Sequence, residues 1–286
     1  MELAGLLACT GEMKVNTVYW SRYRVVVDPA VGPGALPERP RRVLVTHGHA
    51  DHFRYAAAYR EAGAAVLAPR LCAPMVEEPR LNQMATTGWA GPVEDWEITR
   101  YFLGPGVRVD YTLEEGMALP GVSALHTPGH TPGSMSYVFE TGAGRVLVAG
   151  DTVYGREFLE ETPLLYHTDT VAWIASLERL RGLGVDALVP GHGGPVEGRA
   201  EARGLVEANL AAVRGMLRLA LSVLDPDAWV TGDEAAARVA EATGYARSRR
   251  AYSIVGPATR ALLHALASMG EAEEDVRRGV MVWRRR

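Results

Sequence analysis

Short runs of apolar residues, separated by glycine and proline, dominate the first half of the chain and predict a set of short β-strands. Two other stretches, 51–62 and 169–183, place their apolar residues at helical spacing and are expected to be helices. The runs expected as strands are 15–20, 23–27, 42–46, 65–68, 107–111, 122–125, 134–139, 145–149 and 186–189.

The pattern changes about two thirds of the way along the chain, where longer helical spacing replaces the short runs. Alanine, leucine and arginine recur through 199–224, and Asp225-Pro226 ends this helix because proline cannot continue it. Strands first and helices last predict a mixed α/β fold, with one domain over residues 1–203 and a small, mostly helical region over residues 204–286. The other elements expected there are helices at 233–242 and 257–268 and a strand-like segment at 280–283.

The composition is that of a folded globular protein. Of 286 residues, 48% are hydrophobic and 22% are charged, which excludes a disordered or low-complexity chain. The net charge of −4 argues against nucleic-acid binding along the whole chain. Two cysteines cannot build a disulfide framework, so a reducing compartment is expected. The apolar run that ends at Cys9 is too short for a secretion signal, and no run approaches the ~20 apolar residues of a membrane helix, so a cytoplasmic protein is expected.

A cluster of candidate metal ligands follows the expected strand at 42–46. The segment Thr46-His47-Gly48-His49-Ala50-Asp51-His52 contains three imidazoles and one carboxylate. His47 and His49 lie two positions apart in an extended turn, whereas Asp51 and His52 open the next helix and point in another direction. Two divergent ligand sets from one loop suit two adjacent metal ions, and imidazole with carboxylate favours zinc, iron or manganese. The alternative is a polar loop that caps the helix and contains histidines by chance.

Three further candidates stand at later strand ends, beside glycine or proline residues that shape the backbone. His130 lies in a turn-rich loop between two expected strands, Asp151 follows the strand at 145–149, and His192 follows the strand at 186–189. We expect these loops to converge on one edge of the fold and to form one compact metal site on rigid elements.

The motifs THGHADH, PGHTPGS, AGD and PGHGG, in this order over residues 46–194, resemble those of the metallo-β-lactamase superfamily. The resemblance covers most of the first 200 residues and implies an αββα sandwich. It also implies a hydrolytic enzyme with two divalent metal ions, expected to be Zn²⁺, with iron or manganese as alternatives. The implied ligands are His47, His49 and His130 for the first metal, Asp51, His52 and His192 for the second, and Asp151 as the bridge.

The resemblance implies further roles for two aspartates. Asp51 is the catalytic candidate, because it could steer the water shared by the metals or carry its proton in addition to binding metal. Asp28 matches an aspartate that supports the metal loop in this family, although a plain turn residue before Pro29 is the alternative. The thiolate ligand of some true β-lactamases is absent, since Asp151 stands at the matching place. Antibiotic hydrolysis is therefore not expected as the primary role.

Other residues near the motifs are candidates for support or substrate contact. His126 begins the segment HTPGH and is expected to support the site. Tyr154 and His167 follow Asp151 and could line the mouth of a pocket, with an ordinary packed or surface position as the alternative. The long segment 69–105 is expected to be a lid over the pocket, a packed helical excursion or a dimer contact.

The end of the chain is locally basic. Residues 245–286 contain nine arginines and four acidic residues. Two helices followed by an apolar strand resemble a winged helix, an appendage that some proteins of this fold carry. Such a basic face could hold phosphate, and the alternative is a solvated arginine surface or a dimerisation module.

Four functions remain open at this point. The expected one is hydrolysis of a small thioester, ester or lactone, since the motifs resemble the glyoxalase II branch of the superfamily. The alternatives are a nuclease that holds nucleic acid on its basic C-terminal region, and an oxidoreductase resembling the mononuclear-iron persulfide dioxygenases. A binding protein on an inactive scaffold is disfavoured by the complete ligand set. The expected partner is a small-molecule substrate rather than nucleic acid or a membrane, and a homo-oligomer is an open option.

Overall fold

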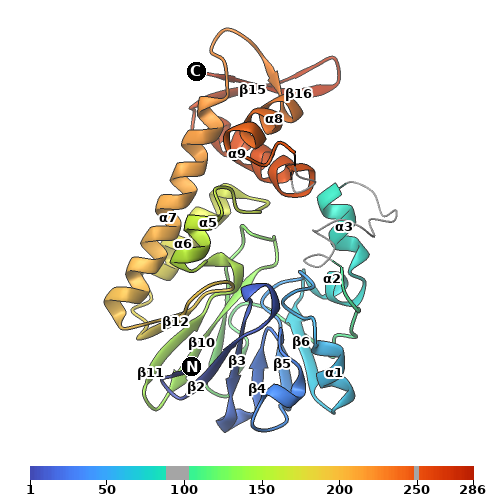
Figure 1. Ribbon diagram of the computed structural model, residues 1–286, viewed down its shortest axis with the longest axis vertical. Coiled ribbons are helices and arrows are strands. Elements are labelled where there is room, and N and C mark those ends of the chain that lie inside the picture. Colours follow the sequence, from blue (N-terminus) through green and yellow to red (C-terminus); the bar gives the residue numbers. More distant parts are fainter. Residues whose placement is uncertain (88–102, 248–250) are drawn as a thin grey trace.

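The computed structural model of the protein describes residues 1–87, 103–247 and 251–286, and two β-sheets stacked face to face form its centre (Figure 1). In order across the first sheet, the strands are β1 (Glu2–Leu3), β2 (Leu6–Thr10), β3 (Asn16–Trp20), β4 (Val25–Val27), β5 (Arg42–Leu44), β6 (Ala65–Pro69) and β7 (Tyr111–Leu113). The strands up to β4 pair antiparallel, and those from β4 to β7 pair parallel. The strands β4 and β6 are unbroken apolar runs, as expected for parallel strands with both faces covered.

The second sheet contains most of the later strands. In order across the sheet they are β13 (Val196–Glu197), β12 (Ala187–Val189), β11 (Gly144–Val148), β10 (Met135–Thr141), β9 (Val122–His126) and β8 (Ala118–Leu119). The strands β9, β10 and β11 form an antiparallel meander, whereas β12 pairs parallel to β11. A parallel step needs a crossover, and this one runs through a 3₁₀ turn, η4 (Gly150–Thr152), and the helices α5 (Arg156–Glu161) and α6 (Thr170–Arg181).

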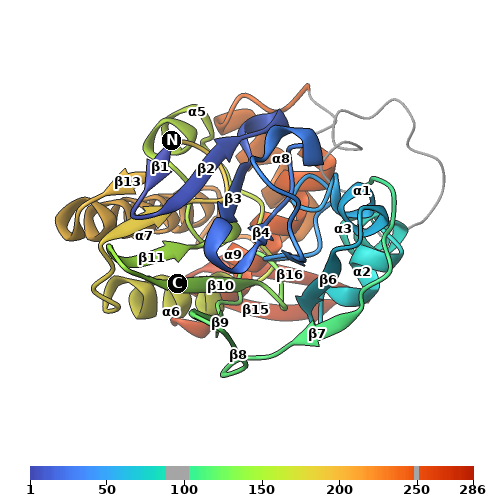
Figure 2. The ribbon, with the colours of Figure 1, turned by 90° about the horizontal axis from the view of Figure 1, so that it is seen from below.

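The hydrophobic core has three layers. Leu44 and Leu67 from the first sheet meet Tyr137 and Val148 from the second in the space between the sheets, and burial of each such aliphatic side chain contributes about 1.5–3 kcal/mol. The helices α1 (Ala56–Glu61) and α2 (Ala73–Glu77) pack on the outer face of the first sheet. The helices α6 and α7 (Arg199–Ser222) pack on the outer face of the second. Figure 2 shows the two sheets as separate layers, with α6 on the far side of β10. The predicted αββα sandwich is confirmed.

The helix α7 leads from the sandwich into a C-terminal unit, which we define as residues 225–286 (Figure 1). The boundary predicted between residues 203 and 204 falls inside α7, which is continuous. Thr231 and Glu234 form a capping box at the start of α8, and this reciprocal pairing satisfies two backbone donors. The elements of the unit are β14 (Val230–Thr231), α8 (Gly232–Ala242), the π-helical turn η5 (Ala251–Val255), α9 (Gly256–Ser268), β15 (Ala272–Arg277) and β16 (Val280–Arg285).

The C-terminal unit contains more strand than the sequence predicts. Its sheet has the order β14-β16-β15, of which the sequence predicts only the strand-like segment at 280–283. The strand β15 contains three consecutive acidic residues and lacks the apolar alternation that marks a strand. It forms because all six of its residues pair with β16 in an antiparallel ladder. The comparison with a winged helix stays a prediction.

Four other elements differ from expectation. The strands β1 and β2 are not among those that the apolar pattern predicts. The strand expected at 107–111 begins only at Tyr111, because Val107 instead bonds through its N–H to the carbonyl of Val76 at the end of α2. The helix expected at 51–62 begins only at Ala56, since residues 51–55 form the turns that carry the candidate ligands.

The segment 69–105 is a helical excursion as far as it is described, containing α2 and α3 (Arg80–Thr87). Its four aromatic residues, and with them the predicted lid, lie outside the described residues. Among the helices that the structure describes, none combines the length and the apolarity needed to cross a membrane. The cytoplasmic location stays a prediction.

Candidate metal centre

Four loops at one edge of the sandwich bring the candidate ligands together. The strand β5 leads into the segment 46–52, and the turn between β9 and β10 contains His130. The strand β11 leads into η4, which contains Asp151, and β12 leads to His192. All seven candidate ligands of the sequence analysis are buried, each at most 6% exposed. They therefore form one enclosed cluster rather than a set of surface groups.

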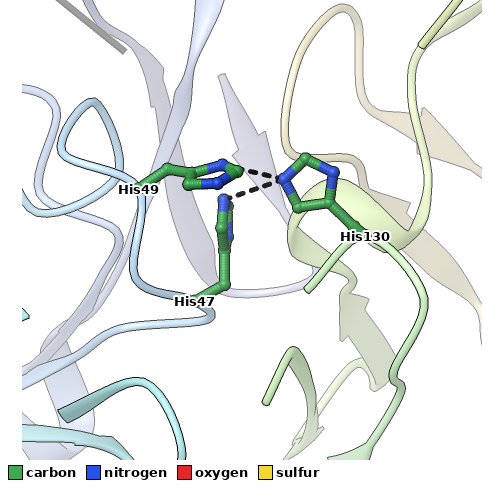
Figure 3. Close-up of side chains that lie close together, drawn as sticks. All are labelled: His47, His49 and His130. Carbon is green, nitrogen blue, oxygen red and sulfur yellow. Dashed lines mark hydrogen bonds between the residues drawn. The ribbon is translucent and has the colours of Figure 1, made fainter. Parts of the chain in front are cut away.

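Three imidazoles converge in the first part of the cluster, as Figure 3 shows. Nε2 of His130 lies 3.2 Å from Nε2 of His47 and 2.9 Å from Nδ1 of His49. The outer nitrogen of His130, Nδ1, lies 2.9 Å from the carbonyl oxygen of Tyr166, to which only an N–H can donate. That bond places the proton of His130 on Nδ1 and leaves Nε2 with a lone pair, which is the form that binds a metal.

The second part of the cluster combines imidazoles with carboxylates. Nε2 of His52 lies 3.1 Å from Oδ1 of Asp151 and 3.4 Å from Nε2 of His192. Nε2 of His192 lies 3.5 Å from Oδ2 of Asp51 and 3.5 Å from Oδ2 of Asp151. Asp151 also approaches the first part, with Oδ2 at 3.4 Å from Nε2 of His130. Three sets of ligand atoms lie within 4.8 Å of one another: His47, His49 and His130; His47, His52 and Asp151; and Asp51, His52 and His192.

Asp28 organises the cluster from behind. Its Oδ1 accepts the backbone N–H of Thr46 at 2.8 Å, and its Oδ2 accepts the hydroxyl of Thr46 at 2.7 Å and Nδ1–H of His52 at 2.8 Å. Since the Thr46 hydroxyl donates to Asp28, its oxygen accepts Nδ1–H of His47 at 3.1 Å. One buried carboxylate thereby turns the Nε2 lone pairs of both His47 and His52 toward the cluster. Asp28 has a left-handed backbone with φ +47°, which is uncommon for a residue other than glycine.

The chemistry of the seven residues fits the binding of divalent metal. Oδ1 of Asp51 and Oδ1 of Asp151 are buried and accept no hydrogen bond from the residues that the structure describes, an arrangement that is costly unless another partner satisfies them. His192 donates Nδ1–H to the carbonyl of Met13 at 2.9 Å and so turns its Nε2 inward as well. Imidazole nitrogens and carboxylate oxygens are ligands that zinc, iron and manganese accept.

The electrostatics of the cluster attract cations. Burial raises the pKa of Asp51 to about 6. Burial also opposes the charged form of Asp151, but His192, His52 and His130 together hold the pKa of this carboxyl well below its usual range. Burial lowers the pKa of His52, but Asp151, Asp51 and Asp28 outweigh it and raise the pKa well above the usual value. The carboxylates that would retain a proton on His52 are equally suited to stabilise a metal cation in its place.

A cavity of about 330 Å³ opens beside the cluster, which is at the small end of the range for small-molecule sites. Asp51, Asp151 and Tyr154 line it. The Tyr154 hydroxyl lies 3.1 Å from Oδ2 of Asp151 and 3.2 Å from Nδ1 of His130. Burial, and next to it the charge of Asp151, raises the pKa of Tyr154 well above its usual value. The hydroxyl is therefore a stable hydrogen-bond donor at the wall of the cavity, where the sequence predicted a pocket-lining residue.

The other two histidines of the sequence analysis lie elsewhere. Nε2 of His126 donates to the carbonyl of Pro132 at 2.9 Å, and His126 belongs to none of the ligand sets. His167 is fully buried, with its ring nitrogens 2.9 Å from the carbonyl of Leu165 and 2.9 Å from the hydroxyl of Thr170. Among the described residues that line the cavity, His167 is not one, so it takes the packed position that the sequence analysis gave as the alternative, with both ring nitrogens engaged within its own turn.

Two asparagines that the sequence analysis missed hold the site in place. Asn209, in the middle of α7, donates to the backbone carbonyl of Tyr154 at 2.9 Å and accepts its N–H at 2.9 Å. Asn16, at the start of β3, donates to the carbonyls of Pro190 and Gly193 on either side of His192. A signal existed for both, because a buried polar residue on an otherwise apolar face requires hydrogen-bond partners.

Comparison with known proteins shows which family and which relatives this chain resembles. A family model described as the metallo-beta-lactamase superfamily matches residues 26–192. An N-acyl homoserine lactonase of Bacillus sp. is 38% identical over 77 residues, which are 26% of this chain and 31% of that protein. A probable metallo-hydrolase of Bacillus subtilis (strain 168), YflN, is 37% identical over 87 residues, which are 26% of this chain and 32% of that protein. The chain thus matches about a third of the length of these relatives.

Solved structures extend the likeness of fold to the whole chain. A metallo-beta-lactamase family protein from Thermus thermophilus has a TM-score of 0.70 at 23% identity and covers 99% of both chains. A beta-lactamase domain protein from Burkholderia ambifaria has a TM-score of 0.64 at 18% identity, over 98% of this chain and 91% of that one. A third protein, TTHA1623 in a di-iron-bound form, has a TM-score of 0.50 at 29% identity, over 69% of this chain and 97% of that one.

Proposed function

The chain belongs to the metallo-β-lactamase superfamily, and on this basis we propose that it is a metal-dependent hydrolase of a small thioester, ester or lactone. The observation that carries the proposal is the complete set of seven buried ligands beside a small cavity. The N-acyl homoserine lactonases among the relatives support a cyclic or open ester as the substrate class. Members of this superfamily bind divalent metals, and we propose Zn²⁺ here, with iron as the alternative because a structural neighbour carries di-iron.

The proposed metals divide the ligands into two groups. His47, His49 and His130 would hold one ion, Asp51, His52 and His192 would hold the other, and Asp151 would reach both. When bound, two such ions supply a hydroxide nucleophile at neutral pH and polarise the scissile carbonyl.

The chain's own groups would orient the substrate and move protons. Asp51 lines the cavity and has an oxygen, Oδ1, that accepts no hydrogen bond, so it can orient the attacking water. The hydroxyl of Tyr154, which donates to Oδ2 of Asp151 in this structure, can exchange that bond for one to the carbonyl or the leaving oxygen of the substrate at the cavity wall. Both groups are held on the edge of rigid elements, as the positioning of reactants requires.

The nuclease alternative has less support. In the described part of the C-terminal unit, Arg260 pairs with Asp233, Arg277 with Asp275 and Arg284 with Glu273. Arg277 and Arg284 also stack on the ring of Trp229. The local excess of arginine is thus partly neutralised within the unit, which reduces its attraction for phosphates.

Metal content provides the first test, with two histidines of one motif as variant and control. Protein purified without chelator or added metal is analysed by inductively coupled plasma mass spectrometry as wild type, His130→Ala and His126→Ala. We expect about two zinc ions per chain in the wild type and in His126→Ala, and about one or fewer in His130→Ala, because only His130 belongs to the cluster. Equal metal loss in both variants would refute the assignment of the cluster.

Activity is then measured with a lactone, a thioester and a phosphodiester. Hydrolysis of the first two should fall in His130→Ala by more than the roughly 10–100-fold that loss of an outer hydrogen-bond partner costs, and removal of metal with a chelator should abolish it. Preference for the phosphodiester would favour the nuclease instead. One iron per chain, with oxygen uptake on addition of a persulfide, would favour the oxidoreductase.

A further inference from the structure

The C-terminal unit contributes directly to the cavity beside the cluster. Tyr245, just after α8, and Ile254, in η5, line this cavity together with residues of the sandwich. The unit lies beyond the edge of the sandwich from which the ligand loops project (Figure 1). The site is therefore closed by a part of the chain that the four ligand motifs do not include.

The position of Ile254 is set by the core of the unit. The next residue, Val255, is fully buried in the hydrophobic cluster that also contains Leu262 and Leu263 of α9 and Leu210 of α7. On its other side η5 packs against α3 of the sandwich. Since Val255 is anchored and Ile254 is only half-buried, the side chain of Ile254 forms a defined apolar surface at the cavity.

The sandwich provides an opposing apolar wall that begins at the ligands themselves. The ring of Phe158 stacks on that of His192 with centroids 4.9 Å apart and on that of Tyr154 with centroids 5.1 Å apart. Leu164 and Leu165 continue this wall, and both are packed into the core. The part of a substrate that extends beyond the metal centre would therefore lie between two apolar surfaces.

The cavity offers little attraction for an extended anion. Lys14 is the one lysine or arginine among the described residues that line it, and its Nζ lies 2.8 Å from Oε2 of Glu161, which lines the cavity as well. This pair is neutral overall. A group that extends toward the C-terminal unit would gain chiefly from burial of apolar surface.

We propose that the C-terminal unit forms the acyl-binding wall of the site, that Ile254 and Tyr245 are specificity-determining residues, and that the substrate carries an uncharged, apolar acyl chain. This inference rests on the proposed function, because it assumes that the same cavity binds a thioester, ester or lactone. It assigns to the C-terminal unit a role in the choice of substrate.

The test compares chain-length profiles for variants of matched chemistry. Values of kcat/KM are measured for p-nitrophenyl esters from acetyl to decanoyl with the metal-loaded wild type, Ile254→Ala, Ile254→Trp and Val276→Trp. Val276 is 61% exposed, belongs to the same unit and does not line the cavity, so it controls for an added tryptophan. Each buried methylene should raise kcat/KM about fourfold until the cavity is full.

We expect Ile254→Trp to lower the octanoyl-to-acetyl ratio of kcat/KM at least tenfold, Ile254→Ala to move the optimum to longer chains, and Val276→Trp to leave the ratio unchanged. Thermal melting shows whether each variant is folded. Folded Ile254 variants with a wild-type profile would overturn the inference and leave the proposed function intact.

Binding of carboxylates separates the two proposals if esters are not hydrolysed. Calorimetry compares octanoate with acetate on the metal-loaded wild type and on Ile254→Trp. Tighter binding of octanoate, with a negative heat-capacity change, that is lost in Ile254→Trp would support the apolar wall even if the proposed function failed. Equal binding of the two carboxylates would overturn the wall.

Discussion

Replacement of Asp28 by asparagine should weaken both metal binding and the fold. The carboxylate of Asp28 accepts three hydrogen bonds of 2.7–2.8 Å, two from Thr46 and one from Nδ1–H of His52. An amide has the same shape but must place its NH₂ group on one side. If that group faces His52, it donates to Nδ1 and moves the imidazole proton to Nε2, the nitrogen that is needed for the metal. If it faces the backbone N–H of Thr46, two donors oppose each other.

The expected magnitude follows from those contacts. Loss of an outer partner of a metal-binding histidine typically lowers metal affinity about 10–100-fold, or about 1.4–2.7 kcal/mol, and we expect this loss at the sites that use His52. Stability should fall by about 1–3 kcal/mol, the cost of one buried group left unsatisfied. Asp28→Ala leaves three donors without an acceptor and should therefore cost more stability than Asp28→Asn.

The assay combines metal competition with thermal unfolding. Zinc affinity is measured against a chromophoric chelator for wild type, Asp28→Asn and Asp110→Asn, and metal content is measured after dialysis. Asp110 is a matched control, because its carboxylate also accepts a backbone N–H, from Val66, and bonds Arg60 away from the cluster. Asp110→Asn should keep wild-type metal content. If Asp28→Asn retained two ions with wild-type affinity, the argument from the proton position of His52 would be refuted.

Two further predictions concern a steric contact and a thiol. In Gly191→Ala the new Cβ would clash with Oδ1 of Asp151, so metal content and hydrolysis should collapse. The control Gly34→Ala, whose Cβ would meet no atom of the described residues, should behave as wild type. Normal metal content in Gly191→Ala would contradict the placement of Asp151. Burial raises the pKa of the Cys72 thiol to about 11, so alkylation of Cys72 by iodoacetamide at pH 8, followed by peptide mass spectrometry, should be about a hundredfold slower in the native protein than in urea. The native rate should rise about tenfold per pH unit because the thiolate fraction does, and equal native and unfolded rates at pH 8 would contradict the burial argument.

Most of the strands and the candidate ligand motifs could be predicted from the sequence because they depend on local patterns, and the resemblance of those motifs to a known family implied the sandwich. Apolar runs such as 42–46 and 145–149 form strands wherever both faces are covered, and each is followed by histidine or aspartate at the strand end. Strand ends meet at one edge of a sheet, so the approximate site follows from order along the chain alone. The predicted helix at 51–62 starts too early for the same reason, because the composition of the turn at 51–55 is also compatible with a helix.

The hydrogen-bond network behind the ligands could not be predicted in this way. Asp28 lies 24 positions before His52, and Asn209 lies 55 positions after Tyr154. The sequence identified Asp28 as a candidate but missed Asn209, and the partner of each depends on how the two sheets and α7 pack. The sequence allowed either a packed position or a pocket-lining position for His167. In the structure His167 is buried in its own turn.

The sequence by itself thus determined the family of fold, the seven candidate ligands and the four loops that carry them. Only the tertiary structure decided which residues orient those ligands, that Tyr154 rather than His167 reaches the cavity, and that Ile254 of the C-terminal unit forms part of its wall. The physical reason is the range of the forces. Backbone hydrogen bonds and apolar periodicity act over a few residues, whereas the shape of a cavity is set by side chains that are distant in sequence and meet only when the core is packed.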